Sequence, residues 1–212
     1  MGINLKFQPV FNCSICPTRC DGHSKSEYVF KDDVALSEEA EDWVLDYLAT
    51  SLELVVKKTT PESQGLPDIE VYRNDKVAAR VEVKAQGRAF MQVSRLLPES
   101  GLLPYETVAL NLSDLDRYID LQGQEGLPIF TVWRVRRPCL GEGYWGNDVR
   151  VLGQLLNEYG PKRRFRRAST QSDFVAGVHK GVTVNYHFSL KELLALDDLM
   201  VQIRVSLQLP DS

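Results

Sequence analysis

The sequence lacks any long apolar run. No segment approaches the ~18 apolar residues that a membrane span needs, and the first residues contain no apolar core of signal-peptide length. Lys6 stands where a myristoylation signal has Ser or Thr. We therefore expect a cytoplasmic protein that is neither inserted in a membrane nor anchored to one.

The chain also lacks an excess of basic residues and has little cysteine. Its formal net charge is -4, which excludes a uniformly basic coat, so any contact with nucleic acid would use local patches. In a cytosolic chain, the four cysteines are more naturally thiols or metal ligands than disulfides.

The remaining composition is that of a globular protein. The 212 residues, 43% hydrophobic and 25% charged, are enough to bury a core without disulfides. We expect one domain over residues 36–212, with a C-terminal extension from about residue 140. An irregular segment rich in cysteine and turn formers, residues 1–35, precedes it.

Alternating helical and strand patterns predict an α/β fold with a mixed sheet flanked by helices. The stretch PIFTVWRV, residues 128–135, predicts an interior strand covered on both faces. The other expected strands cover residues 54–58, 107–112 and 182–188. The expected helices cover residues 38–51, 90–97, 115–122 and 149–159, with a last helix after residue 189. Ser37 and Ser113 are the expected N-caps of the first and third helices, and Ser189 and Glu192 form the capping box of the last. Pro98 should end the second helix, and Gly123 and Gly126 the third.

The stretch GLPDIEVYRNDKVAARVEVKAQG, residues 65–87, predicts a β-hairpin. Its apolar residues alternate with polar ones, and they share one face if Ile69 lies opposite Val81. That register requires a three-residue loop of Asn74, Asp75 and Lys76. It also places Asp68 opposite Glu82, with Cβ atoms roughly 5 Å apart.

Asp68, Glu82 and Lys84 would then share one polar face. Two carboxylates at this distance repel one another unless a cation or a proton relieves them, and Mg²⁺ or Mn²⁺ is the natural complement. The metal would polarise a phosphate oxygen and lower the pKa of a water, while Lys84 would orient the nucleophile or offset charge in the transition state. Glu41 falls on the apolar stripe of the first helix, where a carboxylate needs a partner that the metal would supply.

This constellation resembles the PD-(D/E)xK nuclease superfamily, which has a restriction-endonuclease-like fold. Pro67-Asp68 matches the PD element, Glu82-Val83-Lys84 matches the ExK element, and Glu41 matches the acidic residue of the first helix. The runs AEDWVLDYL, LPDIEVY and VEVKAQ are similar to Holliday-junction resolvases. The likeness spans residues 37–137, and the chain departs from the resolvases in its length and at both ends.

The resemblance implies an Mg²⁺-dependent nuclease that hydrolyses phosphodiester bonds, with DNA as the expected substrate. It implies Asp68, Glu82 and the Val83 carbonyl as metal ligands, with Glu41 supporting them. It also implies Lys84 as the catalytic lysine and Gln86 as a support of the site or a phosphate contact. Two cuts in a duplex would favour a symmetric dimer.

Two other interpretations stay open. In the first, Glu82 and Lys84 belong to an exposed polar strand face that makes ordinary ion pairs, and Asp68 is a loop residue. In the second, the protein is a non-catalytic nucleic-acid-binding or assembly module with a zinc-stabilised N-terminal segment.

The N-terminal segment contains a compact set of candidate metal ligands. Cys13, Cys16, Cys20 and His23 have spacing that lets one loop wrap a tetrahedral Zn²⁺ ion. An iron–sulfur cluster with Cys139 as a distant fourth ligand, or thiols without metal, are the alternatives.

The run PKRRFRR, residues 161–167, predicts a local contact with nucleic acid. The cations would neutralise phosphates, and the aromatic ring would stack on an unpaired base. The residues concerned are Lys162, Arg163, Arg164, Phe165, Arg166 and Arg167, with Arg134, Arg136 and Arg137 as an extension of the patch. A solvated loop is the alternative. His179 and His187 are assigned no catalytic role.

Overall fold

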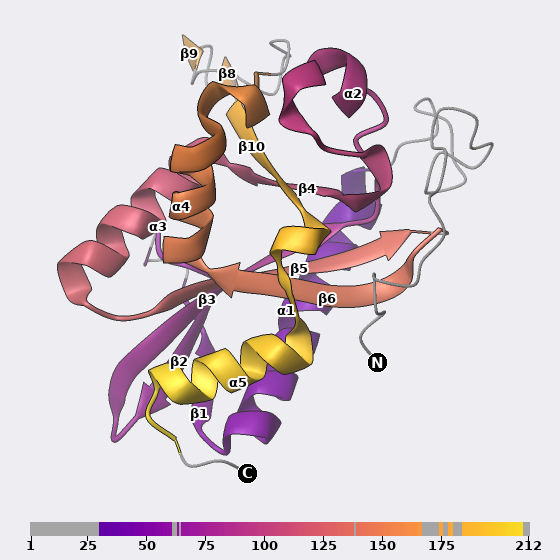
Figure 1. Ribbon diagram of the computed structural model, residues 1–212. Coiled ribbons are helices and arrows are strands. Elements are labelled where there is room, and N and C mark those ends of the chain that lie inside the picture. Colours follow the sequence, from indigo (N-terminus) through magenta and orange to yellow (C-terminus); the bar gives the residue numbers. More distant parts are fainter. Residues whose placement is uncertain are drawn as a thin grey trace.

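The computed structural model describes residues 30–60, 63, 65–137, 139–166, 174–175, 178–179 and 184–209. A six-stranded sheet runs through the middle of the molecule (Figure 1). Its spatial order is β1 (Val55–Lys58), β2 (Ile69–Arg73), β3 (Lys76–Gln86), β5 (Ile129–Arg137), β6 (Gly141–Asp148) and β11 (Leu194–Ala195). Only β3 and β5 are parallel among these neighbours, so the predicted mixed sheet is confirmed.

A smaller antiparallel sheet packs beside the central one. It contains β4 (Thr107–Asn111), β10 (Val184–Ser189) and β7 (Arg164–Arg166), with β10 in the middle. A separate two-stranded ribbon contains β8 (Phe174–Val175) and β9 (Val178–His179).

Helices cover both faces of the central sheet (Figure 1). α1 (Phe30–Leu52) and α5 (Leu196–Ser206) enclose one hydrophobic core. α3 (Leu112–Glu125), α4 (Val149–Tyr159) and the smaller sheet enclose the other. The short turns are α2 (Val93–Leu96), η3 (Pro98–Ser100), η4 (Pro104–Glu106), η5 (Gly160–Arg163) and η7 (Leu190–Glu192). The predicted α/β fold with helices flanking the sheet is confirmed.

β5 is the interior strand that the sequence predicted. Phe130 and Val132 enter the core under α1 and α5, whereas Ile129 and Trp133 enter the core under α3 and α4. Both faces of this strand are therefore buried, which explains its nearly continuous apolar sequence.

α1 begins earlier than predicted. Ser37 lies inside the helix rather than at its N-cap, because no Gly or Pro stands between Phe30 and Ser37 to end a helical turn. The boundary expected after residue 35 therefore falls within α1.

The hairpin has the predicted register but a shorter loop. Ile69 pairs with Val81, and Val71 pairs with Ala79. The turn contains only Asn74 and Asp75, both with positive φ, as a two-residue hairpin turn requires. Because Val71 pairs with Ala79 and the next residue with residue 77, a β-bulge takes up the residue that the prediction assigned to the loop.

Several other element boundaries were wrong. The helical stretch predicted over 90–97 is shorter, and Pro98 begins a 3-10 turn, as proline's fixed φ allows. α3 begins at Leu112 with Asn111 as its N-cap, and it continues through Gly123 to end before Gly126, whose φ is 69°.

The last third contains a strand that the sequence pattern did not indicate. β6 has the sequence GEGYWGND, whose glycines weaken the strand signal, yet it pairs with β5 from Phe130 to Arg137. Residues beyond 140 thus complete the central sheet. The predicted capping box of Ser189 and Glu192 is present, but it caps η7, and α5 begins later without a side-chain cap.

Within the described residues, no helix has the length and apolar character needed to cross a membrane.

Gly146 in β6 allows α5 to approach the sheet, and a matched pair of substitutions tests this. A Cβ atom at Gly146 would clash with the Thr131 carbonyl oxygen and lie 2.6 Å from Cδ2 of Leu199. Gly146→Ala should lower the free energy of unfolding by about 2 kcal/mol or more. Gly123→Ala, at an open helical position, should raise it by about 0.5–1 kcal/mol. Urea unfolding measures both, and an unchanged Gly146→Ala variant would contradict this packing.

Candidate active site

Asp68 and Glu82 lie opposite each other at the base of the β2–β3 hairpin. Ile69 pairs with Val81, so the next position on each side brings the two carboxylates together. The Val83 backbone N–H donates to Asp68 Oδ2 at 2.8 Å, which holds the Asp68 carboxylate across the hairpin. The predicted juxtaposition is therefore present, whereas the catalytic roles stay predictions.

Lys84 lies two residues after Glu82 on the same face of β3, so its side chain reaches the two carboxylates. Its ammonium group contacts Glu82 Oε1. The Glu82 side chain is 3% exposed and that of Lys84 32%, so the lysine lies on the solvent side of the carboxylate. Asp68 is half-buried.

The charges of these three groups are unbalanced. Burial raises the pKa of both Asp68 and Glu82, and although Lys84 lowers them, both pKa values stay above the ordinary range. Repulsion between the carboxylates contributes to the raised pKa of Glu82. Burial alone would lower the pKa of Lys84, but the charges of Glu82 and Asp68 raise it. One ammonium thus serves two carboxylates, which leaves room for a further cation or a proton.

Tyr118 of α3 is a site residue that the sequence analysis missed. Its hydroxyl donates to Glu82 Oε2 at 2.6 Å, and the pair is buried. Burial raises the pKa of Tyr118, and the charge of Glu82 raises it further, so the phenol keeps its proton. The available signal was the helical spacing that turned Tyr118 inward, because a buried tyrosine hydroxyl needs an acceptor.

Glu41 occupies the edge of the site rather than the predicted buried stripe. The inward positions of α1 include Ala40 and Val44, whereas Glu41 is 26% exposed and lies 3.3 Å from the Lys58 ammonium. Lys58, which also lies 2.7 Å from Asp42, balances part of the Glu41 charge, and the support that Glu41 would give to a metal stays a prediction. Glu41 still raises the pKa of Asp68, so it acts on the site electrostatically.

Gln86 links the two sheets. Its Nε2 donates to the Ala109 carbonyl at 2.8 Å, and its Oε1 accepts from the Ala109 N–H at 3.0 Å. Both ends of the amide thus bind the β4 backbone. The roles implied for Gln86, a support of the site or a contact with phosphate, stay predictions, and a contact with phosphate would have to replace these hydrogen bonds.

Arg163 does not belong to a basic surface. It is 4% exposed, and its guanidinium forms a two-pronged ion pair with Glu192 at 2.6 and 2.8 Å. It also lies 3.5 Å from the centre of the Tyr159 ring. A cation placed in this way stabilises the fold and cannot bind phosphate.

Several other residues of the predicted basic patch are also buried or half-buried. Arg134 is buried between Glu39 and Glu142, and Arg137 is buried against backbone carbonyls. Phe165 is half-buried against Phe90, so only part of its ring is accessible. Arg167 lies outside the described residues. The cations that are exposed are Lys162, Arg164, Arg166 and Arg136.

The predicted zinc ligands Cys13, Cys16, Cys20 and His23 lie outside the described residues, so the zinc site stays a prediction. Cys139 is half-buried and packs against the core under α3 and α4. Among residues that the structure does describe, no three His, Cys, Asp or Glu side chains form a group that could hold a metal ion.

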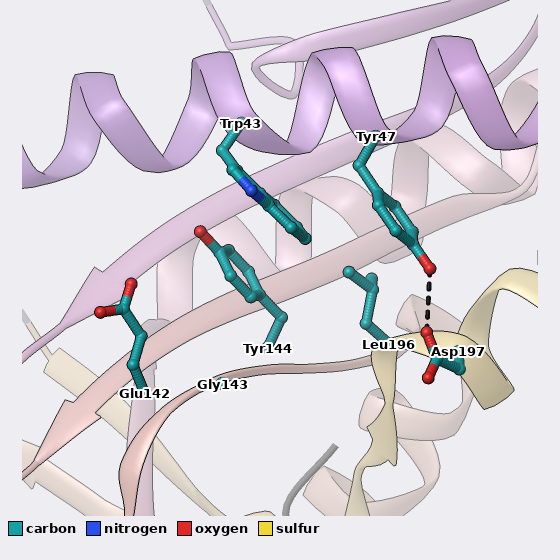
Figure 2. Close-up of a pocket in the computed structure, with 7 residues that line it drawn as sticks. All are labelled: Trp43, Tyr47, Glu142, Gly143, Tyr144, Leu196 and Asp197. Atoms are coloured by element: carbon teal, nitrogen blue, oxygen red, sulfur yellow. Dashed lines mark hydrogen bonds between the residues drawn. The ribbon is translucent and has the colours of Figure 1, made fainter. Parts of the chain in front are cut away.

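A separate pocket of about 190 Å³ lies between α1, β6 and the start of α5 (Figure 2). The Trp43 ring stacks on Tyr144 with centroids 4.0 Å apart and on Tyr47 with centroids 5.0 Å apart. The Tyr47 hydroxyl donates to Asp197 at 2.9 Å. Glu41 contacts β1 whereas Trp43 contacts β6, so this stack is on the opposite side of α1 from the carboxylates.

Comparisons with known proteins found similar structures but no matching sequence. No family model matches the chain, and the search of curated proteins found no match. Hjc, a Holliday junction resolvase from the archaeal hyperthermophile Archaeoglobus fulgidus, is 10% identical with a TM-score of 0.42, over 78% of this chain and 95% of that chain. A nuclease from a fusselovirus is 11% identical with a TM-score of 0.46, over 85% of this chain and 95% of that chain.

Asp68→Asn should stabilise the protein in EDTA at pH 7. Asparagine keeps an acceptor for the Val83 N–H but removes one of the two negative charges. Because folding raises the pKa of Asp68, the wild type loses stability as pH rises through that pKa, and the variant lacks this part of the loss while Glu82 keeps its own. The gain should be on the order of 1 kcal/mol at pH 7 and vanish below the ordinary carboxyl pKa.

Urea unfolding between pH 3.5 and pH 7 measures this difference, with Asp46→Asn on the exposed side of α1 as the control. A variant that is less stable than wild type at pH 7 would show that the carboxylates do not repel each other.

Proposed function

We propose that this protein is a divalent-metal-dependent nuclease that hydrolyses phosphodiester bonds of nucleic acid, with DNA as the expected substrate. The observation that carries the proposal is the juxtaposition of Asp68 and Glu82 beside a single lysine. Such an excess of negative charge in a shielded place is costly unless a cation balances it. Catalytic sites are where such costs are commonly retained.

The side chains present suit Mg²⁺ or Mn²⁺. Asp68 and Glu82 offer hard carboxylate oxygens, and the Val83 carbonyl is the further ligand that the motif resemblance implies. Mg²⁺ is usually held by one or two carboxylates, with water and substrate phosphates as its other ligands. A site with two carboxylates therefore fits this ion without a third acidic ligand.

The residues of the chain divide the work of hydrolysis. A divalent ion would polarise the phosphodiester and lower the pKa of the attacking water. Lys84, whose pKa is raised, is protonated at neutral pH, so it stabilises negative charge on the phosphate rather than taking a proton. Tyr118 holds Glu82 in place, and Glu41 adds negative potential from α1.

The reaction is an ordinary hydrolysis. The water oxygen forms a bond to phosphorus, and the bond from phosphorus to the leaving sugar oxygen breaks. One water proton ends on the leaving hydroxyl, and the other is released to solvent. The Lys84 ammonium lies beside the carboxylates. From there it would offset the negative charge that develops on the phosphate oxygens in the transition state.

A cleavage assay on labelled single-stranded, duplex and branched DNA tests the proposal. With Mg²⁺ or Mn²⁺ the wild type should cut at least one substrate, and EDTA should abolish cutting. Lys84→Ala should lower the rate by about 100-fold or more, the usual effect of losing one charge-stabilising group. Lys76→Ala, at an exposed position of the same strand, should cut like the wild type.

Two outcomes would contradict the proposal. Equal cutting by wild type and Lys84→Ala would assign the activity to another site or to a contaminant. Binding of DNA without cutting of any substrate would favour the non-catalytic module.

A further inference from the structure

A cavity of about 360 Å³ opens beside the candidate active site. It lies between the end of β3, the loop that follows it and the smaller sheet. Among its lining residues are Gln86, Phe90, Phe165, Asn185 and His187. Its volume is in the range of small-molecule sites, and the proposed chemistry makes no use of it.

The strand pattern explains why these side chains converge. On β10, Asn185 and His187 alternate with Tyr186 and Phe188, which are buried in the core under α3 and α4. Asn185 and His187 therefore face the other side of the smaller sheet. Phe165 on β7 is paired with Asn185 and shares that face. Phe90 comes from the loop after β3.

The cavity has aromatic walls. The Phe90 ring is stacked on His187, with centroids 4.8 Å apart, and lies 5.1 Å from the Phe165 ring. Both phenylalanines are half-buried, so part of each ring remains accessible from the cavity. Aromatic rings at such a surface are stacking partners for any planar heterocycle.

The cavity also has polar groups that can read the edge of a heterocycle. His187 is 4% exposed, and burial lowers its pKa to about 4, so it is neutral at pH 7. Its Nδ1 lies 3.2 Å from the Arg163 carbonyl, which can only accept, so Nδ1 carries the proton. Nε2 is then an acceptor, and the half-buried Asn185 amide offers both a donor and an acceptor.

The cavity lies next to the candidate active site along β3. Gln86 lines the cavity, and it lies two residues after Lys84 on the same face of β3. The two positions are roughly 7 Å apart along the strand, a distance that one nucleotide can bridge. Arg88, which is exposed, also lines the cavity and brings a cation for the negatively charged backbone.

We propose that this cavity, lined by Phe90, Phe165, Asn185 and His187, binds one unpaired nucleobase of the strand whose phosphodiester lies at Lys84. This inference rests on the proposed nuclease function and narrows its substrate. A base in an intact duplex is stacked and paired, so it enters a cavity only after it is flipped out, which costs free energy that an unpaired base does not need. The preferred substrate is therefore single-stranded DNA or a duplex with an unpaired nucleotide.

Binding in EDTA separates this inference from catalysis. The probes are a duplex with one unpaired 2-aminopurine and the same duplex with that base paired to thymine. The wild type should bind the unpaired probe about tenfold more tightly, the effect of one base stacked on an aromatic ring. The fluorescence of the unpaired 2-aminopurine should fall on binding because the base becomes stacked.

Three variants locate the effect. Phe165→Leu and Phe90→Leu keep an apolar side chain but remove the ring, and they should reduce the preference to about twofold or less while leaving paired-duplex affinity unchanged. Asn185→Ala removes a polar group without disturbing the rings, and it should reduce the preference as well. Trp43→Leu, which removes an exposed aromatic ring on the far side of α1, is the matched control and should keep the preference.

Equal affinity of the wild type for both probes, or an unchanged preference in all three variants, would overturn the inference. Full competition by a free nucleoside monophosphate at the concentration where the strand binds would also overturn it, because the cavity would then belong to a small molecule. If the protein cuts DNA but does not prefer the unpaired probe, only the inference that the cavity binds a base is refuted. If it prefers the unpaired probe but cuts no DNA, only the proposed catalysis is refuted.

Discussion

Two carboxylates, one buried and one half-buried, share a single lysine on the polar face of β3, and the elements around them are arranged about that excess of charge. The hairpin register sets Asp68 against Glu82, and the Val83 N–H fixes the contact. α3 contributes the Tyr118 hydroxyl from one side of the sheet, and α1 contributes Glu41 from the other. The fold thus supplies acceptor oxygens and one ammonium group. The negative charge that remains is left for a bound cation or a proton to balance.

Short-range patterns predicted much of the fold. Period-two alternation gave the hairpin register, and the continuous apolar run gave β5, because each depends only on which face of a strand is buried. The pattern failed for β6, since its glycines carry no periodic signal and its pairing with β5 depends on contacts across the sheet. It also failed for Ser37, because a good capping residue inside a longer helix looks the same in sequence as one at its start.

In the candidate site too, some residues could be predicted from local sequence and others could not. Asp68, Glu82 and Lys84 could be grouped from sequence because one hairpin carries all three. Tyr118 is 36 residues from Glu82, and the partner of Arg163 is 29 residues away. Those contacts depend on how α3 and η7 pack, which local spacing does not encode. A basic run therefore looked like a nucleic-acid surface although one of its arginines, Arg163, is a buried structural cation.

The central claim is that Asp68 and Glu82 hold one divalent ion together. X-ray diffraction from crystals soaked in Mn²⁺ tests this directly, because the anomalous signal of manganese locates the ion. The account predicts one peak in contact with both carboxylates, and none there in Asp68→Asn crystals. Manganese bound elsewhere, with Lys84 still paired to Glu82 and no ion between the two carboxylates, would contradict it.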